Sequence, residues 1–474
     1  MTSPNISFDS IPSSIRKPGK YFEFNTRLAV RTLPANLQRV LIVGQKTATG
    51  TQAALAAVDI FSDRQASDFF GPGSMLHLMC KAAITAYPYL ALSAIALDDA
   101  GAGVAASGTV TITGPATAAG VLSVKVANQQ IDVAITNADT PTIIAAALVA
   151  QIGKQPDLPV TAAAALGVVT LTAKHKGTLG NEIKVSAEVT SGIGVTAVVV
   201  AMAAGATDPD IATALAPAFA AGHDIIVTPY NAQADLVKLR THLDAVSGPL
   251  EQRGADGVYG YTGTLAGATT LAGLVNSGRI TGALLPSTLS LSYELAAAYG
   301  AVIASEEDPS RPLNTLELKG IAVPPVANRL SRTEQENALH NGVTPLEVGP
   351  GDRVQIVRAI TTYTLDAQAI PDISLLDLTT IRTLDYVRKA VRERIALRFP
   401  RDKLSDRTPP KVRSEILDVL YKLEELEIVE AVEANKAGLI VERDLQDPNR
   451  LNGKIPADVV NGLHVFAGRI DLLL

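Results

Sequence analysis

DPDIATALAPAFAAGHDIIVTPYNAQADLVKLRTHLDAV, residues 208–246, shows the alternation on which the architecture rests. Apolar residues recur at helical spacing over 208–222 and over 231–246, whereas HDIIVTPY (223–230) is a short β-branched run typical of a buried strand. Similar strand-like runs lie at RVLIVG (39–44), YLALSAIAL (89–97) and TGALLP (281–286), and MLHLMCKAAITA (75–86) has a helical pattern. Alternating strands and helices predict an α/β domain whose sheet is connected by helical crossovers.

A segment of different composition interrupts this pattern. From Ala100 to Ala203 the chain has no Arg, Phe, Tyr or Trp and is rich in Ala, Val, Thr and Gly. Alternating runs such as GTVTITG (108–114) predict strands. We therefore expect residues 99–203 to form an inserted, mainly β domain within a host domain of residues 21–98 and 204–350, because a loop of a host tolerates insertion when the inserted ends lie close together.

The region 351–474 differs again. TTIRTLDYVRKAVRERIALRF (379–399) has one apolar helical stripe, and a second helix is expected after the prolines of TPP (408–410). VQIVRAITTY (354–363), AGLIVERD (437–444) and LHVFAGRIDLLL (463–474) have strand patterns. Together these patterns predict a mixed α/β (α+β), multidomain chain with a host domain, an insert, a C-terminal domain and an extended segment at each end.

The composition excludes several classes of protein. The chain has 474 residues, of which 47% are apolar and 19% charged, and its net charge is −6. This balance fits a folded multidomain protein and lacks the basic excess of a nucleic-acid binder. The single cysteine, Cys80, excludes an intrachain disulfide and suits a reducing compartment.

No targeting or spanning segment is expected. The first twenty residues lack the apolar core of a secretory signal, and the apolar low-charge stretch 82–97 is shorter than the ~20 apolar residues that a spanning helix needs. We therefore expect a chain that is made in a cytoplasm, without direct contact to nucleic acid and without stable membrane association.

The nearest approach to a nucleotide-binding motif is incomplete. In VLIVGQKTATGT (40–51) a glycine follows a strand, but Gly44 and Gly50 are one residue too far apart for a phosphate-binding loop. Thr51 stands where that motif requires lysine. An ordinary strand-to-helix turn is therefore expected, and no cofactor-binding residue is assigned.

Other candidate reactive groups are isolated. His77 and Cys80 are three residues apart, but no second pair completes the four ligands of a structural zinc site. The acidic run Glu306–Asp308 is interpreted as a solvated turn, with a catalytic carboxylate pair as the alternative. We assign no catalytic residue and no metal ligand, and expect a protein that is not an enzyme.

Two neighbouring helices carry opposite charge. Eleven basic and four acidic residues lie between Arg382 and Arg413, whereas seven acidic and one basic residue lie between Ser414 and Glu433. Arg388 and Arg392 form a like-charge i,i+4 pair, which destabilises a helix on its own. Either the two helices neutralise one another or remain solvated, or the basic face contacts an acidic partner, for which Arg388 and Arg392 are the candidates.

The C-terminal segment has an apolar face. Ile470, Leu472 and Leu474 alternate with Arg469 and Asp471, and Phe466 precedes them. Because an exposed apolar edge strand promotes aggregation, this segment is expected to pair, either with the sheet of its own chain or with that of a neighbour.

The N-terminal segment, residues 1–20, has a similar short pattern. Ile6 and Phe8 alternate with polar residues, and prolines follow. A frayed end is one interpretation. The other is an arm that reaches a neighbour, because residues 9–20 could span ~40 Å when extended.

Three stretches carry a family resemblance. They are ISFDSIPSSIRKPGKYFEF (6–24), DPSRPLNTLELKGI (308–321) and, most specifically, residues 373–474. In these stretches the chain resembles the contractile-tail sheath proteins of the Mu-like phage branch. The insert, which contains TAKHKGTLGNEIKV (172–185), resembles the variable outer domain of such sheaths more weakly.

The resemblance implies a structural machine. Sheath subunits stack as hexameric rings around a tail tube and contract to drive that tube through the host envelope. It implies a virion tail assembled in the host cytoplasm, with the chain itself, the tail tube protein, and baseplate and tail terminator proteins as partners. The C-terminal domain, 351–474, would lie next to the tube, and arms of neighbouring subunits would extend its sheet.

Carried over to this sequence, the arms would be Ile6 to Phe8 and Phe466 to Leu474, whereas the assignment of Arg388 and Arg392 to the tube face rests on charge alone. A sheath subunit of a bacterial contractile injection system is an alternative. An α/β enzyme is another alternative, but it would need a motif that the sequence lacks. A surface-binding protein whose insert contacts sugars or a receptor is a third, and against sugar binding the insert has no aromatic residue with which to stack on sugars.

Overall fold

A mostly parallel sheet organises the middle of the protein. The computed structural model describes residues 16–22 and 33–472, and within them the largest sheet has eight strands in the order β15-β14-β13-β12-β11-β1-β3-β2. Only the two edge strands, β2 and β15, pair in antiparallel fashion. The strands are Arg39–Gln45 (β1), Ala57–Ile60 (β2), Ala91–Leu97 (β3), Ile225–Val227 (β11), Asp256–Tyr261 (β12), Ile280–Leu284 (β13), Thr344–Gly349 (β14) and Arg353–Ile356 (β15).

Helices cover this sheet because its inner strands are apolar along their whole length. β11 and β13 are fully buried, and α7 (Ser292–Ser305) is apolar nearly all round, so it lies in the core between α2 and the strands. The remaining helices of this unit are Asp63–Phe70 (α1), Met75–Ala86 (α2), Ala212–Ala218 (α4), Gln233–Ser247 (α5), Leu265–Val275 (α6) and Arg332–His340 (α8), with a short 3-10 turn at Val326–Asn328 (η3).

The insert is a two-sheet β domain, and all of its residues are described. One sheet has the order β10-β4-β8-β7 and the other β6-β5-β9. Along β4 buried and exposed residues alternate, as a sheet with one solvated face requires. The elements are Ala105–Thr113 (β4), Gly120–Val126 (β5), Gln129–Ile135 (β6), Pro141–Gly153 (α3), Val160–Ala165 (β7), Val168–Lys176 (β8), Thr178–Glu182 (η2), Val185–Val189 (β9) and Thr196–Ala203 (β10).

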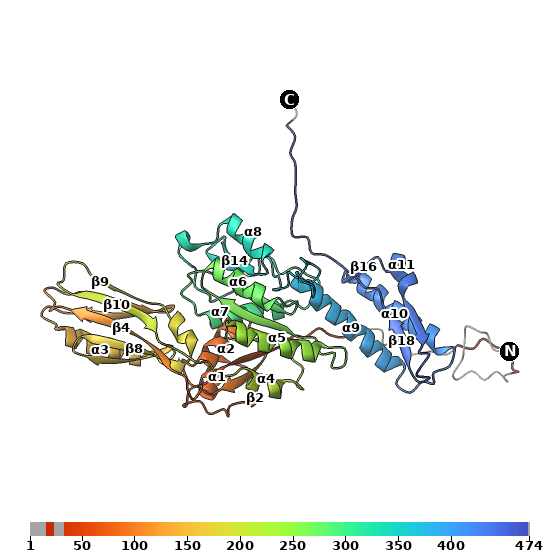
Figure 1. Ribbon diagram of the computed structural model, residues 1–474, viewed down its shortest axis with the longest axis horizontal. Helices are drawn as coiled ribbons and strands as arrows, with labels where there is room; N and C mark the ends of the chain where they lie inside the picture. The colour runs from red at the N-terminus through yellow and green to blue at the C-terminus, as the bar shows by residue number, and fades with distance from the viewer. Residues whose placement is uncertain (1–15, 23–32, 473–474) are drawn as a thin grey trace.

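The C-terminal unit has its own apolar core. Helix α9 (Leu378–Arg398) begins in the core of the middle unit and, from Tyr386 onward, belongs to the core of the C-terminal unit. The other elements are Thr408–Glu425 (α10), Val429–Glu430 (β16), Val432–Asn435 (α11), Lys436–Gly438 (η4), Ile440–Arg443 (β17), Leu451–Lys454 (β18) and Asp458–Val459 (β19). Figure 1 shows the insert, the middle unit and the C-terminal unit in a row, with the C-terminal segment projecting away.

The predicted mixed α/β class and multidomain organisation are confirmed, but two predicted strands differ. The run 354–363 is a strand only as far as Ile356, after which Thr362 N–H bonds to the Ile280 carbonyl and the chain leaves the edge of the sheet. Residues 463–472 form no strand within the described chain because no strand of the same chain lies beside them.

Candidate functional site

The C-terminal arm, residues 463–472, is an apolar segment without a partner strand in the described chain. Phe466, Ile470 and Leu472 are 88, 98 and 83% exposed. The arm is fixed at its base, where Asn314 Nδ2 and His464 Nδ1 lie 3.0 Å apart. Beyond this point it extends into solvent (Figure 1). Of the other predicted arm residues, Ile6, Phe8 and Leu474 lie outside the described residues.

An apolar hollow lies in the C-terminal unit. It has a volume of about 430 Å³ and lies between the end of α9, helix α10 and the β17–β18 hairpin. In the described chain β17 pairs only with β18, so each of these strands has an open edge beside the hollow. Its apolar lining includes Phe399, Val412, Ile416, Val441, Leu451 and Ile455.

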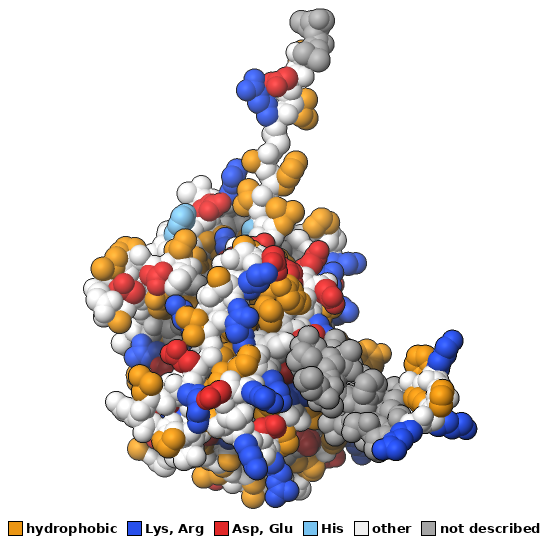
Figure 2. Space-filling view, turned by 90° about the vertical axis from the view of Figure 1, so that its right-hand side faces the viewer, with side chains coloured by type: hydrophobic (Ala, Val, Ile, Leu, Met, Phe, Trp, Pro, Cys, Tyr) orange, Lys and Arg blue, Asp and Glu red, His pale blue; other side chains and the backbone are white. Residues whose placement is uncertain are grey.

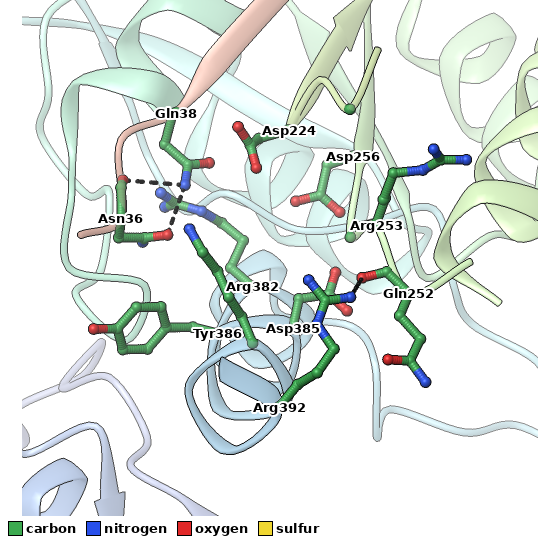
Figure 3. Close-up of a pocket in the computed structure, with 13 residues that line it drawn as sticks. Asn36, Gln38, Asp224, Gln252, Arg253, Asp256, Arg382, Asp385, Tyr386 and Arg392 are labelled. Atoms are coloured by element: carbon green, nitrogen blue, oxygen red, sulfur yellow. Dashed lines mark hydrogen bonds between the residues drawn. The ribbon is translucent and has the colours of Figure 1, made fainter. Parts of the chain in front are cut away.

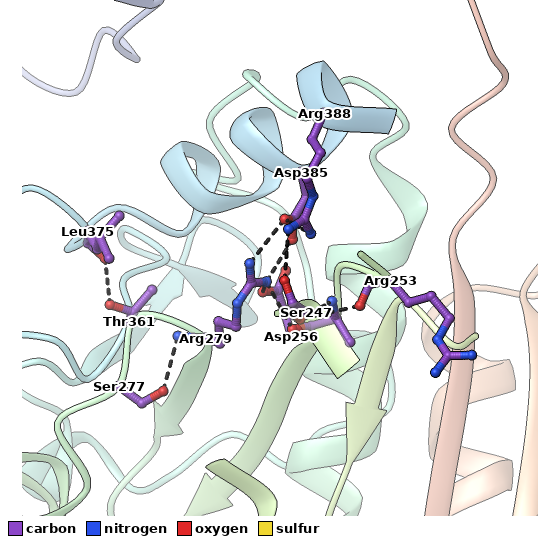
Figure 4. A network of polar contacts seen from close by, with 10 residues as sticks. Ser247, Arg253, Asp256, Ser277, Arg279, Thr361, Leu375, Asp385 and Arg388 are labelled. Atoms are coloured by element: carbon purple, nitrogen blue, oxygen red, sulfur yellow. Dashed lines mark hydrogen bonds and ion pairs between the residues drawn. The ribbon is translucent and has the colours of Figure 1, made fainter. Parts of the chain in front are cut away.

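Arg388 and Arg392 both contact the middle unit of their own chain. Arg388 donates from Nη1 to the Ser247 carbonyl and from Nη2 to Asp385 Oδ1, each at 2.7 Å (Figure 4). Arg392 Nη1 donates to the Gln252 carbonyl at 3.1 Å. These bonds hold α9 against the loop after α5. Among the described residues Arg392 has this carbonyl and no acidic counter-ion as its partner, so the prediction that this face meets an acidic partner stays a prediction.

A cluster of buried charges lies at the same junction. Arg279 forms two bonds to Asp385, at 2.6 and 3.0 Å (Figure 4). Arg382 donates to the Glu306 carbonyl at 2.7 Å. Arg382 and Asp385, together with Asp224 and Asp256, line a hollow of about 160 Å³ (Figure 3). Burial raises the pKa of Asp256 to about 7, and Arg279 is the nearest cation, 4.0 Å away. The cluster was not predicted from the sequence.

Part of the opposite charge on α9 and α10 is neutralised within the unit. Arg394, 4% exposed, reaches Glu415 Oε2 at 3.2 Å and Asp418 Oδ2 at 2.7 Å. The interpretation that the two helices neutralise one another therefore applies where Arg394 of α9 meets Glu415 and Asp418 of α10. It does not apply to the loop after α9 and the first turn of α10.

Four basic side chains of that loop and turn are exposed and form no hydrogen bond or ion pair within the described residues. They are Arg401, Lys403, Arg407 and Lys411. Figure 2, which views the C-terminal unit end-on, shows Lys and Arg side chains gathered on this end of the molecule. We call this set the basic loop. It offers unpaired positive charge to a partner.

The groups considered for chemistry have structural surroundings. Cys80 is fully buried, and burial raises the pKa of its thiol. His77 is buried, and both of its ring nitrogens have partners. A Cβ on Gly50 would lie 2.5 Å from the Phe69 carbonyl, so the phosphate-loop-like segment is a packed turn.

Neither a metal site nor a membrane helix is found in the part of the chain that the structure describes. No group of three or more His, Cys, Asp or Glu side chains there is placed to hold a metal ion. No helix within it has the length and hydropathy to span a bilayer.

Comparisons with known proteins cover almost the whole chain. Residues 204–362 match the phage tail sheath protein central domain, and residues 371–472 match the phage tail sheath C-terminal domain. The chain is 35% identical, over 489 aligned positions, to the Mu-like prophage FluMu tail sheath protein of Haemophilus influenzae, with 99% of this chain and 100% of that protein covered.

The fold is similar to those of solved sheath structures. A sheath tail protein of Listeria innocua matches with a TM-score of 0.52 at 14% identity, covering 92% of this chain and 94% of that one. The PVC sheath of an extracellular contractile injection system matches with a TM-score of 0.50 at 11% identity, covering 97% of this chain and 98% of that one. These likenesses show the fold, whereas the full-length identity to the Haemophilus protein shows the family: the chain belongs to the Mu-like contractile tail sheath proteins and is a structural sheath subunit.

Proposed function

We propose that the chain polymerises with its own copies as stacked hexameric rings around a tail tube, and that contraction of this sheath drives the tube through the host envelope. The family supports self-assembly, and the similar PVC sheath is described in a contracted state. The further partners would be the tail tube protein and the baseplate and tail terminator proteins. The polymer assembles in the host cytoplasm, becomes part of the virion tail and works mechanically, without catalysis.

The observation that carries this proposal is the unpaired apolar arm. Burying a Phe, Ile or Leu side chain contributes ~1.5–3 kcal/mol, and a ladder hydrogen bond contributes about 1 kcal/mol net. An isolated subunit gains neither, because Phe466, Ile470 and Leu472 are exposed. The open edges of β17 and β18, beside an apolar hollow, offer both to the arm of a neighbouring subunit.

The N-terminal segment provides the second connection in this proposal. Ile6 and Phe8 would pair with a neighbour in the same way, and residues 9–20 would serve as the tether. Backbone pairing of this kind survives rotation of the subunits because the tethers absorb the movement while the ladder persists. Contraction would then convert one packing of linked subunits into another of lower free energy.

The surface that meets the tube is proposed to include the basic loop as well as Arg388 and Arg392. The basic loop has no acidic partner among the described residues and therefore keeps its full charge. Arg388 shares Asp385 with Arg279, so one carboxylate serves two guanidinium groups. An acidic tube surface would offset the remaining positive charge.

Removal of the arm tests the proposal. Deleting residues 463–474 is expected to leave a folded subunit that no longer forms sheath tubes, as judged by circular dichroism, light scattering and negative-stain microscopy. Two variants of unchanged length test whether the apolar side chains of the arm are what matters. Changing Phe466, Ile470 and Leu472 all to Ser should abolish tubes, whereas R469S/D471S should retain them. Ordinary tubes from the deletion would refute the arm assignment.

A bacterial contractile injection system is the second candidate setting for the same subunit. The likeness to the PVC sheath over 97% of the chain supports this second setting. Neighbouring genes distinguish the two settings, because capsid and packaging genes accompany only an infectious virion.

A further inference from the structure

The insert is fastened to the middle unit by the short segment that opens α2. Lys174, on β8 of the insert, donates from Nζ to the Pro72 carbonyl at 2.9 Å and to the Pro156 carbonyl at 2.6 Å. Lys81, on α2, pairs with Asp157 of the insert at 2.6 Å. The two units approach so closely here that a Cβ on Gly73 would lie 2.4 Å from the Leu158 carbonyl.

One histidine of the insert completes this joint in a defined protonation state. The Met75 N–H donates to His175 Nε2 at 2.9 Å. Because a backbone N–H can only donate, Nε2 carries no proton. The other ring nitrogen, Nδ1, lies 3.1 Å from Asp99 Oδ1 and therefore carries the proton of the neutral ring.

A second histidine repeats the arrangement two residues away along the same segment. The Gly73 N–H donates to His77 Nδ1 at 3.0 Å, and His77 Nε2 lies 2.9 Å from Asp63 Oδ1. His77 is 1% exposed, so water does not replace the ring as an acceptor. The segment between α1 and α2 is thus held by two neutral imidazoles, each accepting one backbone N–H.

The charged groups around each ring come from several elements. His175 faces Asp99, which follows β3, and its own strand carries Lys174 and Lys176 beside it. Asp99 also accepts from Gln45 Nε2 at 2.7 Å and from the Lys176 N–H at 3.2 Å. The Asp99 carboxylate would stabilise a protonated His175. A second proton on the ring would therefore break the bond from the Met75 N–H without leaving the new positive charge unpaired.

The surroundings of His77 are similar in kind. Asp63 lies on α1, Lys81 is one turn further along α2, and Asp157 belongs to the insert. Lys81 reaches both Asp157, at 2.6 Å, and Asp63, at 4.0 Å. Protonation of His77 would give Asp63 a full counter-ion and remove the acceptor of the Gly73 N–H.

We propose that this joint is a proton-sensitive lock between the insert and the middle unit. Imidazoles take up a second proton in mildly acidic water, and both nitrogens of the protonated ring are donors. In a protonated His175 or His77, the ring nitrogen that accepted the backbone N–H carries a proton itself. Two donors then face each other, so the ring and the backbone N–H separate. The segment that opens α2 loosens its hold on the insert, while the bonds of Lys184 to the Thr288 carbonyl and of Ser292 to Glu182 keep the insert attached elsewhere.

Hydrogen exchange of the purified full-length subunit at pH 7.5 and pH 5.5, corrected for intrinsic rates, tests the lock. The wild-type protein should lose protection at the amides of Gly73 and Met75 by about fivefold at the lower pH, the effect of one net hydrogen bond. In H175Q the side-chain oxygen accepts from Met75 at both pH values, so that amide should keep its protection. H340Q, at the end of α8, serves as the control and should respond as the wild type does.

Two results would overturn the proposal: wild-type protection at Met75 that does not change with pH, or an equal loss in H175Q. The amides of β5 and β6, remote from the joint, provide an internal reference, since an equal loss there would mean global unfolding. If H175Q does not fold, the ¹⁵N shifts of the wild-type imidazoles decide, because the lock requires an unprotonated Nε2 on His175 at pH 7.5.

Discussion

Replacing Asp256 by Asn should stabilise the subunit in a pH-dependent manner. Asp256 begins β12 and is only 6% exposed, and burial raises its pKa from 3.8 to about 7. The folded protein therefore binds this proton more tightly than the unfolded chain. Stability is lost as the pH rises from about 4 through about 7, and the loss levels off above that value. Asn has nearly the same shape and no charge to bury.

The size of the effect follows from the shift. At about 1.4 kcal/mol per pKa unit, the wild-type protein loses about 1.5 kcal/mol by pH 5 and about 4 kcal/mol by pH 8, relative to a group that does not ionise. These are upper values, because local relaxation lowers the cost of a buried charge. D256N should thus be nearly as stable as the wild type at pH 4 and clearly more stable at pH 8.

Urea titrations of the unassembled subunit at pH 4, 5 and 8, followed by circular dichroism, measure this difference. D68N is the matched control, because Asp68 is exposed on α1 and its side chain forms no bond within the described residues. The control should show the wild-type dependence on pH. A D256N variant that is less stable than the wild type at pH 8, or whose advantage does not grow between pH 5 and pH 8, would show that burial does not raise the pKa of Asp256.

Two further changes address the junction and the basic surface. G254A should destabilise the subunit by about 1–3 kcal/mol in urea, because the new Cβ would lie 2.3 Å from a carboxylate oxygen of Asp385. The control G273A should be neutral or slightly stabilising, because its new Cβ meets nothing within 4 Å. Reversing Arg388 and Arg392 to Glu, or Arg401 and Lys403 of the basic loop to Glu, should weaken pull-down of the tail tube protein more at low salt than at high salt. Unchanged pull-down by one pair would remove that pair from the proposed tube face.

Elements with local patterns were predicted well from the sequence. The segment 75–86 forms α2 with those bounds, and the stripe predicted over 379–399 forms α9 from Leu378 to Arg398. Both helices depend on apolar spacing and on flanking residues within a few positions. The strand predicted over 463–474 is not formed by residues 463–472, because a strand needs a partner and the described part of the chain supplies none.

Interactions between distant residues could not be predicted in the same way. The charge of Arg388 is visible in the sequence, but its acceptor, the Ser247 carbonyl, lies 141 residues away. Asp256 is one acidic residue among many until the sheet and α9 bury it beside Arg279. The buried charge cluster therefore has no sequence pattern of its own, and the basic loop becomes distinct only once the pairing of Arg394 is known.

Helix α9 is the element that makes the middle and C-terminal units move together. Its first turns, at Leu378 and Ile381, belong to the core of the middle unit, and its later turns belong to the core of the C-terminal unit. Between them, Asp385 is held by Arg279 from the middle unit and by Arg388 from its own helix. Because a rotation of the helix would break these bonds and expose both cores, we expect the two units to turn as one body, so that flexibility during contraction resides in the arms.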